Sequence, residues 1–598
     1  MTAIPIPDLT LPQMVRERAR ATPDRVALRQ KEFGIWRPYS WKDYETRARH
    51  FALGLDALGI GAGGKVGVLS ENRVEWVVAQ IGAGMIGAAT VGVYATSPTP
   101  EVAYIVAHGD IEVIVCEDQE QTDKVLAARG ELPHLRRIIA IEMRGMGDYP
   151  ADLVVSFESV EALGAAHADP ALVDRRLDAQ RLDDLALLIY TSGSTGRPKG
   201  AMITYAGIHA GMPALLARTR MDARSVSLSY LPLCHVAEQL FTTFGHIYAG
   251  SLVNFGESLR TVQSDLREIA PTVFLGVPRI WEKLHAAIHI KALETGGLRR
   301  TLFDRAFALA GPIVAKPAAR RTAAERATYA LCHLLVFRAL QNFIGLRRCR
   351  VAASGAAPIP PEVFRFFQVI GVPIIEAYGA TEASGLIACH EPGDVRTGTV
   401  GRAVDGLELR LAEDGEILIR GAQLFAGYYK NAEATAQSMA DGWYHTGDVG
   451  RIEDGHLRIA DRKRDIMITA GGKNLAPSEI EHAVKASPFV KECIVIGEGR
   501  RYVSALVQIE FDTVSKWAEE RGLAYTTYRS LAEHPDVVTL VQREVDRANA
   551  TMADVAHVRR FRLLTKELDH DDDELTATMK IRRGNIHKKY AEQIESLY

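Results

Sequence analysis

Short apolar runs alternate with longer amphipathic stretches over about the first 400 residues of the chain. The runs are rich in valine and isoleucine, as buried strands are, and they include residues 65–69, 113–116, 272–275 and 372–375. Strands that alternate with helices form parallel β-sheets. The pattern therefore predicts an α/β fold in which parallel-sheet subdomains make up a large N-terminal domain.

From residue 401 the chain changes to short strands separated by tight turns. The strand-like runs 407–411 and 416–420 flank a Glu-Asp-Gly turn at 413–415, and the same three residues recur at 453–455. Asp-Gly turns between such runs are typical of β-hairpins. This part predicts a small antiparallel subdomain of the large domain.

A small α+β domain is expected after the charged segment 461–465. Its strands are predicted near 466–469, 492–496 and 503–509, and its helices near 477–486 and 536–550. A chain of 598 residues also exceeds what one hydrophobic core usually supports. We therefore expect an N-terminal domain at 1–462 and a mobile C-terminal domain at 463–598.

Residues 76–100 carry no charge over a length that could cross a bilayer. The segment is rich in glycine and alanine, which favours a tightly packed helix followed by a strand at 91–94 over a membrane span.

Composition restricts the partners and the compartment. A net charge of −3 argues against a nucleic-acid partner. The six cysteines are scattered without a CxxC pair, and the N-terminus lacks the pattern of a signal peptide. We expect a cytoplasmic protein that works in a reducing compartment, as a monomer or homodimer.

Residues 190–200 combine three glycines, four serines or threonines and one lysine after an apolar run. Glycines allow backbone N–H groups to approach an anion closely, so the loop predicts a phosphate site. The spacing excludes a Walker A loop, because proline and glycine flank the lysine. The alternative is a flexible surface loop. The candidate residues are Thr191, Ser192, Gly193, Ser194, Thr195, Gly196 and Lys199.

Two later segments add weaker signals. Residues 376–382 offer an aromatic ring, a hydroxyl and a carboxylate, as an adenine and a magnesium-bound phosphate require, although a core tyrosine at a turn would look the same. Residues 443–448 place an aspartate after a tight turn, where it suits a ribose diol or serves only the turn.

In this order the three segments resemble the adenylate-forming (AMP-binding) superfamily of acyl-CoA synthetases, luciferases and nonribosomal adenylation domains. Segments 354–358, 461–462, 471–481 and 575–580 match the family's remaining motifs. The resemblance covers almost the whole chain, and it implies ATP, Mg²⁺ and coenzyme A as cofactors.

The resemblance also implies roles for individual residues. The loop from Thr191 to Lys199 would grip the β- and γ-phosphates of ATP, and Thr381 would contact the α-phosphate. Glu382 would hold Mg²⁺. The adenine and ribose would be bound by Gly355, Ala356, Ala357, Tyr378, Asp448 and Arg462.

Lys580 is the expected catalytic residue, together with Thr381 and Glu382. Forming an acyl adenylate brings a carboxylate onto the α-phosphate, and a positive charge that bridges the two anions stabilises the transition state. The alternative for Lys580 is a solvated lysine in a basic cluster with Arg582 and Arg583.

In the family the C-terminal domain swings before coenzyme A attacks the acyl adenylate. By position the hinge residue is Arg464, where relatives usually carry aspartate or lysine. Gly471 and Gly472 would border the channel for the coenzyme A thiol arm, where absent side chains allow close approach; an ordinary turn is the alternative.

Segments 230–238 and 271–283 resemble the long-chain and very-long-chain fatty acyl branch of the family. His235, Gln239 and Gly379 are the expected residues of the acyl pocket. Some relatives place a gating tryptophan at the position of Gln239, so the resemblance leaves the chain-length preference open.

The resulting expectation is an ATP-dependent ligase for coenzyme A and a medium- to long-chain fatty acid. One alternative is a ligase for another carboxylic acid, with an aryl, branched or steroid side chain. Another is an enzyme that loads a separate carrier protein, and a third is a non-catalytic binding protein that senses acyl-CoA or nucleotide.

Residues 299–350 contain eleven arginines or lysines against two acids, interleaved with apolar runs. Such a stretch can lie on an anionic membrane surface, here the inner face. The favoured interpretation is a pair of ordinary surface helices that cap the large domain.

Overall fold

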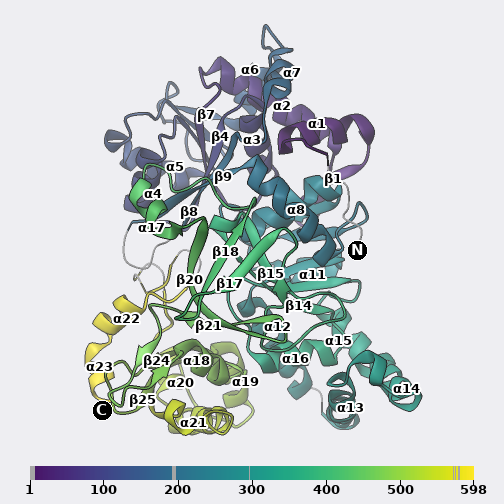
Figure 1. Ribbon diagram of the computed structural model, residues 1–598, viewed down its shortest axis with the longest axis vertical. Coiled ribbons are helices and arrows are strands. Elements are labelled where there is room, and N and C mark those ends of the chain that lie inside the picture. The colour runs from purple at the N-terminus through teal and green to yellow at the C-terminus, as the bar shows by residue number, and fades with distance from the viewer. Residues whose placement is uncertain (1–6, 192–196, 295, 570–571, 573, 577–579) are drawn as a thin grey trace.

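The computed structural model describes residues 7–191, 197–294, 296–569, 572, 574–576 and 580–598. Figure 1 shows a large α/β body, an antiparallel subdomain beside it, and a smaller C-terminal domain below. The fold class predicted from the hydrophobic pattern is confirmed.

The largest sheet has seven strands in the order β7-β6-β5-β3-β4-β8-β9. Its strands are parallel except β9, which runs antiparallel to β8. Their bounds are β3 Lys65–Leu69, β4 Ala89–Val93, β5 Val113–Cys116, β6 Arg137–Ala140, β7 Val154–Ser156, β8 Leu185–Thr191 and β9 Lys199–Thr204.

Helices surround the sheets of the large domain. They are α1 Leu11–Ala21, α2 Trp41–Ala57, α3 Val74–Met85, α4 Thr99–His108, α5 Gln119–Ala127, η1 Arg129–Glu131, α6 Phe157–Ala165, α7 Leu172–Ala179, α8 Tyr205–Thr219, α9 Val236–Glu238, η2 Gln239–Gly245, α10 His246–Ala249, α11 Val262–Ile269, α12 Pro278–Glu294, α13 Leu298–Val314, η3 Ala318–Arg320, α14 Ala323–Cys332, η4 His333–Phe337, α15 Arg338–Phe343, α16 Pro361–Val369, η5 Thr381–Ala383 and α17 Ala432–Ser438. Among the described residues, no helix combines the length and the apolar character that a bilayer span needs.

Both faces of the seven-stranded sheet are covered by helices, which explains its continuous apolar strands. Val113 and Val115 of β5 pack in one cluster with α2, α3 and α6. Ile114 and Cys116 pack in another cluster with α4 and α5. The uncharged segment 76–100 supplies α3 and β4 to this core, so the predicted helix followed by a strand is correct.

Two further sheets complete the large body, and both mix parallel and antiparallel pairs. One has the order β10-β11-β1-β2 and the other β12-β13-β14-β15-β16. Their bounds are β1 Val26–Glu32, β2 Ile35–Ser40, β10 Val226–Ser229, β11 Leu252–Phe255, β12 Val273–Gly276, β13 Val351–Ser354, β14 Ile374–Ala380, β15 Gly385–Cys389 and β16 Arg402–Ala403.

The strand expected at 372–375 is shifted. Pairing with β13 begins at Ile374, and β14 then continues to Ala380 because β15 adds an antiparallel partner for Ala377 and Tyr378. The adenine-binding candidate Tyr378 therefore lies within strand β14, opposite Ala388 of β15.

The antiparallel subdomain consists of β17 Leu407–Leu411, β18 Glu416–Gly421, β19 Met439–Ala440, β20 Trp443–Glu453 and β21 His456–Arg462. Both predicted hairpins are present, and their turns place Gly415 and Gly455 at φ values of 82° and 81°. Only glycine adopts this conformation at no steric cost.

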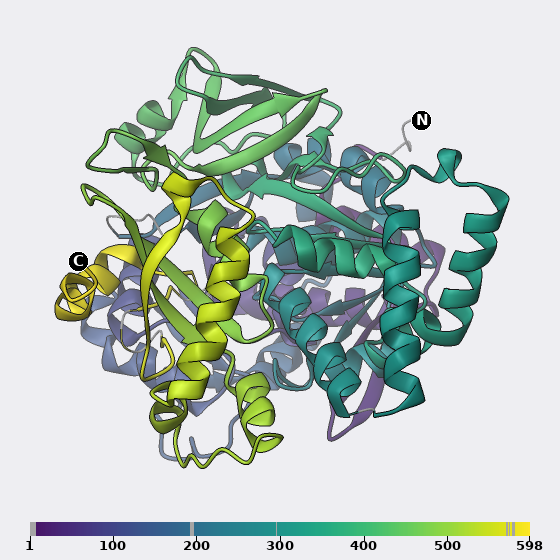
Figure 2. The same cartoon turned by 90° about the horizontal axis from the view of Figure 1, so that it is seen from below.

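The C-terminal domain packs helices on a three-stranded sheet, β24-β25-β26, and has its own apolar core. Its elements are β22 Met467–Ile468, β23 Asn474–Leu475, α18 Pro477–Lys485, β24 Val490–Ile496, β25 Val503–Ile509, α19 Phe511–Glu519, α20 Tyr528–Ala532, α21 Pro535–Asn549, η6 Asp554–Ala556, β26 Val558–Leu563, α22 Arg583–Lys589 and α23 Ala591–Glu595. Seen from below in Figure 2, this domain lies beside the helices of the large body.

A buried ion pair fastens β1 to α11. Lys31 Nζ lies 2.9 Å from Asp265 Oδ1, and the two side chains are 6% and 1% exposed. Lys31→Met would leave the Asp265 carboxylate buried without its cation, so we expect a loss of about 3 kcal/mol in the free energy of unfolding. Arg37→Met, which removes the exposed pair with Glu32 on the neighbouring strand, should cost less than about 1 kcal/mol. Urea unfolding followed by circular dichroism would measure both, and equal losses would contradict the prediction.

Candidate active site

The phosphate-loop candidates sit where β8 turns into β9. Thr191 ends β8 and pairs directly with Lys199, the first residue of β9. The candidates between them, Ser192, Gly193, Ser194, Thr195 and Gly196, lie outside the described residues. The described structure thus fixes the two ends of the loop at the carboxyl end of a parallel strand, which is where α/β sheets bind ligands.

Tyr428 contacts two residues of the candidate phosphate site, Lys199 and Glu382. The Lys199 ammonium lies 5.2 Å from the centroid of the Tyr428 ring, and the Tyr428 hydroxyl donates a 2.7 Å hydrogen bond to Glu382 Oε1. The backbone of Tyr428 is held against β9 by a bridge to Ala201. The sequence analysis missed Tyr428, because only a long-range backbone pairing brings it between Lys199 and Glu382.

The adenine-wall candidates line the ends of two neighbouring strands. Gly355 follows β13, and a Cβ atom there would lie 3.2 Å from the carbonyl oxygen of Ala377 on β14. Ala356 and Ala357 continue from it with exposed side chains, and Ala356 has a φ of 70°. Tyr378 comes next on β14, so the structure brings these four candidates together.

Asp448 is the meeting point of two further candidates. Its Oδ2 accepts a 2.5 Å hydrogen bond from the Tyr378 hydroxyl, and its Oδ1 lies 3.1 Å from Arg462 Nε. Asp448 and Arg462 face each other across the β20–β21 pair. Burial alone would lower the pKa of Arg462, but Asp448, Tyr378 and Glu382 outweigh it and raise the pKa. Arg462 therefore stays charged at the site.

Lys580 comes from the C-terminal domain and reaches the same place. A bridge between Leu575 and Ile581 closes the turn that carries it, and its N–H donates to Thr576 Oγ1 at 3.0 Å. Desolvation and then Arg462 lower the pKa of Lys580, Asp448 opposes the shift, and Arg464 adds to it. The side chain still reaches solvent, so Lys580 stands at an accessible edge of the site.

His235 of the large domain is the acyl-pocket candidate whose pKa responds to the charge of Lys580. Burial and the nearby Lys580 charge lower the pKa of His235 to about 4. Its Nδ1 accepts a 3.1 Å hydrogen bond from the Ala237 N–H, so the neutral ring carries its proton on Nε2. His235 therefore offers an uncharged donor beside the lysine.

The other two acyl-pocket candidates have structural partners. Gln239 is fully buried, donates to the Leu233 carbonyl at 2.7 Å, and accepts from Gln80 Nε2 at 2.9 Å. Gly379 lies at an irregular step between β14 and β15, where a Cβ atom would come within 2.2 Å of the Gly385 carbonyl oxygen. Their role toward an acyl chain stays a prediction.

The hinge and channel candidates lie at the start of the C-terminal domain. Arg464 follows β21, and burial together with Arg462 lowers its pKa. Gly471 and Gly472 form the exposed turn between β22 and β23, and a Cβ atom at Gly472 would meet nothing within 4 Å. The contacts described for Gly471 and Gly472 lie within this turn. Among the described residues, no contact connects the two glycines with Lys580.

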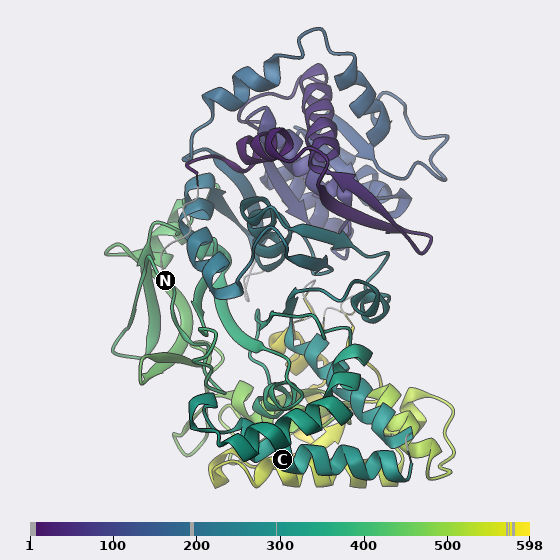
Figure 3. The same cartoon turned by 90° about the vertical axis from the view of Figure 1, so that its right-hand side faces the viewer.

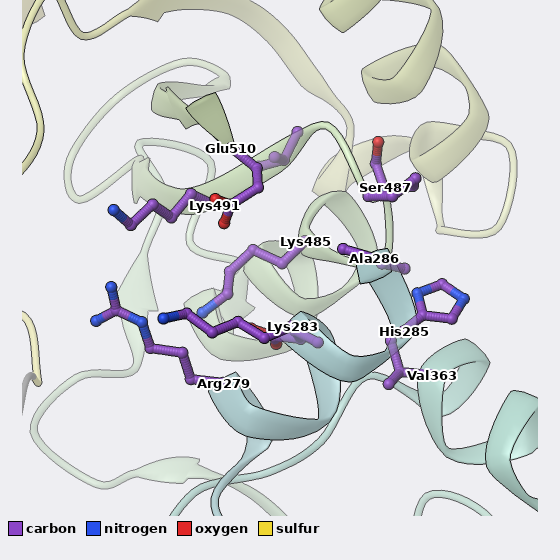
Figure 4. Close-up of a pocket in the computed structure, with 13 residues that line it drawn as sticks. Arg279, Lys283, His285, Ala286, Val363, Lys485, Ser487, Lys491 and Glu510 are labelled. Atoms are coloured by element: carbon purple, nitrogen blue, oxygen red, sulfur yellow. The ribbon is translucent and has the colours of Figure 1, made fainter. Parts of the chain in front are cut away.

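Polar contacts hold the C-terminal domain against the large domain. A pocket between α12 and the C-terminal domain is lined by Arg279 and Lys283 on one side and by Lys485, Lys491 and Glu510 on the other. Figure 4 shows the charged ends of Arg279, Lys283 and Lys491 directed to the same side of this pocket. Burial and the charge of Arg279 lower the pKa of Lys283.

Arg582 and Arg583, the basic residues that follow Lys580, form ion pairs with acidic residues. Arg583 forms a two-pronged pair with Glu481, at 2.8 and 2.7 Å, and Arg582 lies 4.0 Å from Glu101 of α4. These arginines have acidic partners, whereas the described influences on the Lys580 side chain are the charges of Arg462, Asp448 and Arg464. The role of Lys580 as a catalytic residue stays a prediction.

Two family models match the chain. The model described as AMP-binding enzyme matches residues 15–429, and the model described as AMP-binding enzyme C-terminal domain matches residues 464–598. The long-chain-fatty-acid–CoA ligase FadD15 of Mycobacterium bovis is 33% identical over 98% of this chain and 96% of its own length. The long-chain-fatty-acid–CoA ligase ACSBG2 of Xenopus laevis is 30% identical over 99% and 84%.

Solved structures share the fold. The anthranilate CoA ligase AuaEII in complex with anthranoyl-AMP matches with a TM-score of 0.72 and 20% identity, over 99% of each chain. The A-PCP didomain of the carboxylic acid reductase from Segniliparus rugosus, in complex with AMP, matches with a TM-score of 0.77 and 21% identity, over 99% of this chain and 82% of that one.

Mutation of Tyr428 tests the hydrogen bond between its hydroxyl and the Glu382 carboxylate. Tyr428→Phe removes the hydrogen bond that orients the Glu382 carboxylate, and a bond to a charged group is worth about 1.5 to 3 kcal/mol. We expect the half-saturating Mg²⁺ concentration for ATP binding to rise on the order of tenfold. Tyr429→Phe is the matched control, because the neighbouring hydroxyl bonds to Asp110 instead. Equal effects in a Mg²⁺ titration would contradict the assignment.

Proposed function

The chain belongs to the AMP-binding enzyme family, and we propose that it is an ATP-dependent ligase that joins medium- to long-chain fatty acids to coenzyme A. The observation that supports the proposal is the charge coupling between Lys580 of the C-terminal domain and Asp448, Arg462 and His235 of the large domain, next to the Arg462–Asp448 ion pair. The names of FadD15 and ACSBG2 support the acid and the thiol.

Two steps make up the reaction. A carboxylate oxygen of the acid bonds to the α-phosphorus of ATP, the bond to the β-phosphate oxygen breaks, and pyrophosphate leaves. The thiol sulfur of coenzyme A then bonds to the acyl carbon, AMP leaves, and a proton is released. Both steps move negative charge near the α-phosphate, so positive charge held there lowers the barrier.

The chain's own residues supply that charge. We assign Lys580 to bridge the attacking carboxylate and the α-phosphate, with Thr381 as a further phosphate contact. Asp448 accepts the ribose hydroxyls, while Tyr378 and the segment from Gly355 to Ala357 flank the adenine. Arg462 orients the Asp448 carboxylate through its contact at 3.1 Å.

Glu382 fits a divalent cation. Tyr428 occupies its Oε1, and among the described residues no hydrogen bond takes its Oε2, so a carboxylate oxygen remains for Mg²⁺. When bound, Mg²⁺ neutralises phosphate charge and favours the departure of pyrophosphate. Lys199 and the Thr191 loop would hold the β- and γ-phosphates next to it.

We also propose that the second step uses another orientation of the C-terminal domain. The hinge would be Arg464, between an N-terminal domain at 1–462 and a C-terminal domain at 463–598. The turn at Gly471 and Gly472 would then border the thiol arm of coenzyme A. Support comes from the separate core of the C-terminal domain and from its polar, open contact with α12.

A reducing cytoplasmic setting is proposed as well. All six cysteines are free, and five of them are buried. Burial raises the pKa of the Cys389 thiol to about 12, so this thiol stays protonated and inert.

A panel of acids tests the proposed substrate. We expect CoA-dependent formation of AMP with saturated acids of medium to long chain, measured with coenzyme A present and omitted. Turnover with an aromatic acid but not with palmitate would replace the fatty acid by an aryl substrate. Acid-dependent exchange between ATP and pyrophosphate without any CoA product would instead indicate a carrier protein as the acceptor.

Lys580→Ala should slow acid-dependent exchange between ATP and pyrophosphate at least about a hundredfold. Lys588→Ala, an exposed lysine of α22, is the control and should leave the rate unchanged. The protonated lysine is the active form, so the wild-type rate falls as the pH rises through its lowered pKa. Lys580→Arg should retain part of the activity and move this fall to higher pH, because the guanidinium stays charged. An unchanged alkaline limb would remove Lys580 from the charge-bridging role.

A further inference from the structure

The basic segment at 299–350 forms a helical projection at one end of the large domain. Helices α13 and α14, with η4 and α15 after them, make a hairpin that extends beyond the rest of the chain in Figures 1 and 2. We call residues 298–348 the basic leucine hairpin. Nothing in the proposed ligase mechanism uses it.

Aromatic side chains fix the inner face of the hairpin to the large domain. Phe307 of α13 stacks on Phe366 of α16 with 5.0 Å between ring centroids, and it contacts Phe337 edge to face at 5.3 Å. Phe337 is fully buried. The hairpin is therefore a rigid extension of the large domain, and its packing is satisfied without its outer face.

The outer face carries leucines that the fold leaves in solvent. Fifteen large hydrophobic side chains are exposed among the described residues, and six of them lie between 298 and 335. Their spacing, at three to four residues or multiples of it, places them in a stripe along each helix. They are Leu298, Leu302, Leu309, Leu331, Leu334 and Leu335, and they are between 41% and 75% exposed.

Positive charge accompanies these leucines. Residues 299–350 hold eleven arginines or lysines and two acids, whereas the whole chain has a net charge of −3. Both acids are already paired within the hairpin, Asp304 with Arg300 at 3.0 Å and Glu325 with Lys316 at 2.5 Å. Arg350 pairs with Asp222 outside the hairpin, so residues 298–348 themselves hold ten arginines or lysines against two acids, an excess of eight positive charges on the element that carries the leucines.

We propose that the basic leucine hairpin docks on the surface of an anionic lipid bilayer. The leucines enter the boundary between headgroups and acyl chains, and the arginines meet the anionic headgroups, as in amphipathic helices that bind membranes. A nucleic acid would match the charge but would leave the leucines in water. A second copy of the chain would oppose like charges across a symmetric contact.

The hairpin is attached to two helices, α12 and α16, of the large domain. These helices follow β12 and β13 in the chain. Gly355, a candidate for the adenine wall, directly follows β13. An enzyme docked through the hairpin would have a fixed orientation toward the bilayer in which long-chain acids dissolve. This inference goes beyond the proposed function and does not depend on it.

Co-sedimentation of the full-length protein with vesicles tests the proposal. We expect binding to phosphatidylcholine vesicles that contain phosphatidylglycerol, little binding to phosphatidylcholine alone, and release at high salt, because salt screens the headgroup charge. Each arginine near an anionic surface contributes about 1 kcal/mol. The triple variant Arg305→Gln, Arg320→Gln, Arg326→Gln should therefore bind on the order of a hundredfold more weakly.

The leucines are tested separately from the charge. Leu331→Ser, Leu334→Ser and Leu335→Ser in one chain should weaken binding at least about tenfold, since each buried leucine contributes roughly 1.5 kcal/mol or more. The matched control replaces exposed apolar residues elsewhere, Leu163, Leu259 and Val538, and should bind as the wild type does. Unchanged melting temperatures and unchanged turnover of a short, water-soluble acid would show that the variants are folded.

Three outcomes would overturn the proposal. One is the absence of salt-sensitive binding to the anionic vesicles, and another is an equal loss of binding in the control variant. The third is a leucine variant that keeps vesicle binding but turns a dimer into a monomer in light scattering, because the hairpin would then be a contact between copies. Ligase activity is a separate measurement, so failure of docking leaves the proposed reaction standing.

Discussion

The organisation of this protein depends on a single electrostatic constraint: two anions must meet, and positive charge must be held between them. Asp448 provides the fixed point, because the Tyr378 hydroxyl donates to one of its oxygens and the Arg462 guanidinium contacts the other. Arg462 is in register with Asp448 because β20 and β21 pair as a hairpin. Lys580 completes the arrangement from a different domain, so the position of that domain decides whether the charge is present.

The contacts between the two domains are compatible with the proposed change in orientation of the C-terminal domain. Each domain has an apolar core of its own, whereas the surface between them is lined by Arg279, Lys283, Lys485 and Lys491. Separating polar, hydrated surfaces costs far less than opening a core. In Figure 3, helices α13 to α15 lie in front of the C-terminal domain. The largest sheet lies at the opposite end of the molecule. The proposed movement of the domain that carries Lys580 would leave these sheets unchanged.

The same division between rigid frame and exposed surface applies to the basic leucine hairpin. Its phenylalanines pack inward on α16, and its leucines face solvent together with the excess of arginines. A helix needs only one apolar face to fold onto a core. The second apolar face is therefore not explained by stability, and it gives the large domain a surface of its own beside the catalytic machinery.

The sequence by itself determined the local elements and the chemistry of the candidate residues. The strands at 65–69 and 113–116 and the turns at Gly415 and Gly455 follow from apolar runs and glycine, because these signals lie within a few neighbouring residues. Only the tertiary structure decided that β15 extends β14 through Tyr378, that Tyr428 stands between Lys199 and Glu382, and that Gln80 engages Gln239. Lys580 and His235 are likewise brought together across 345 positions of the chain. Such contacts join residues far apart in sequence, and no local period or spacing encodes which of them meet.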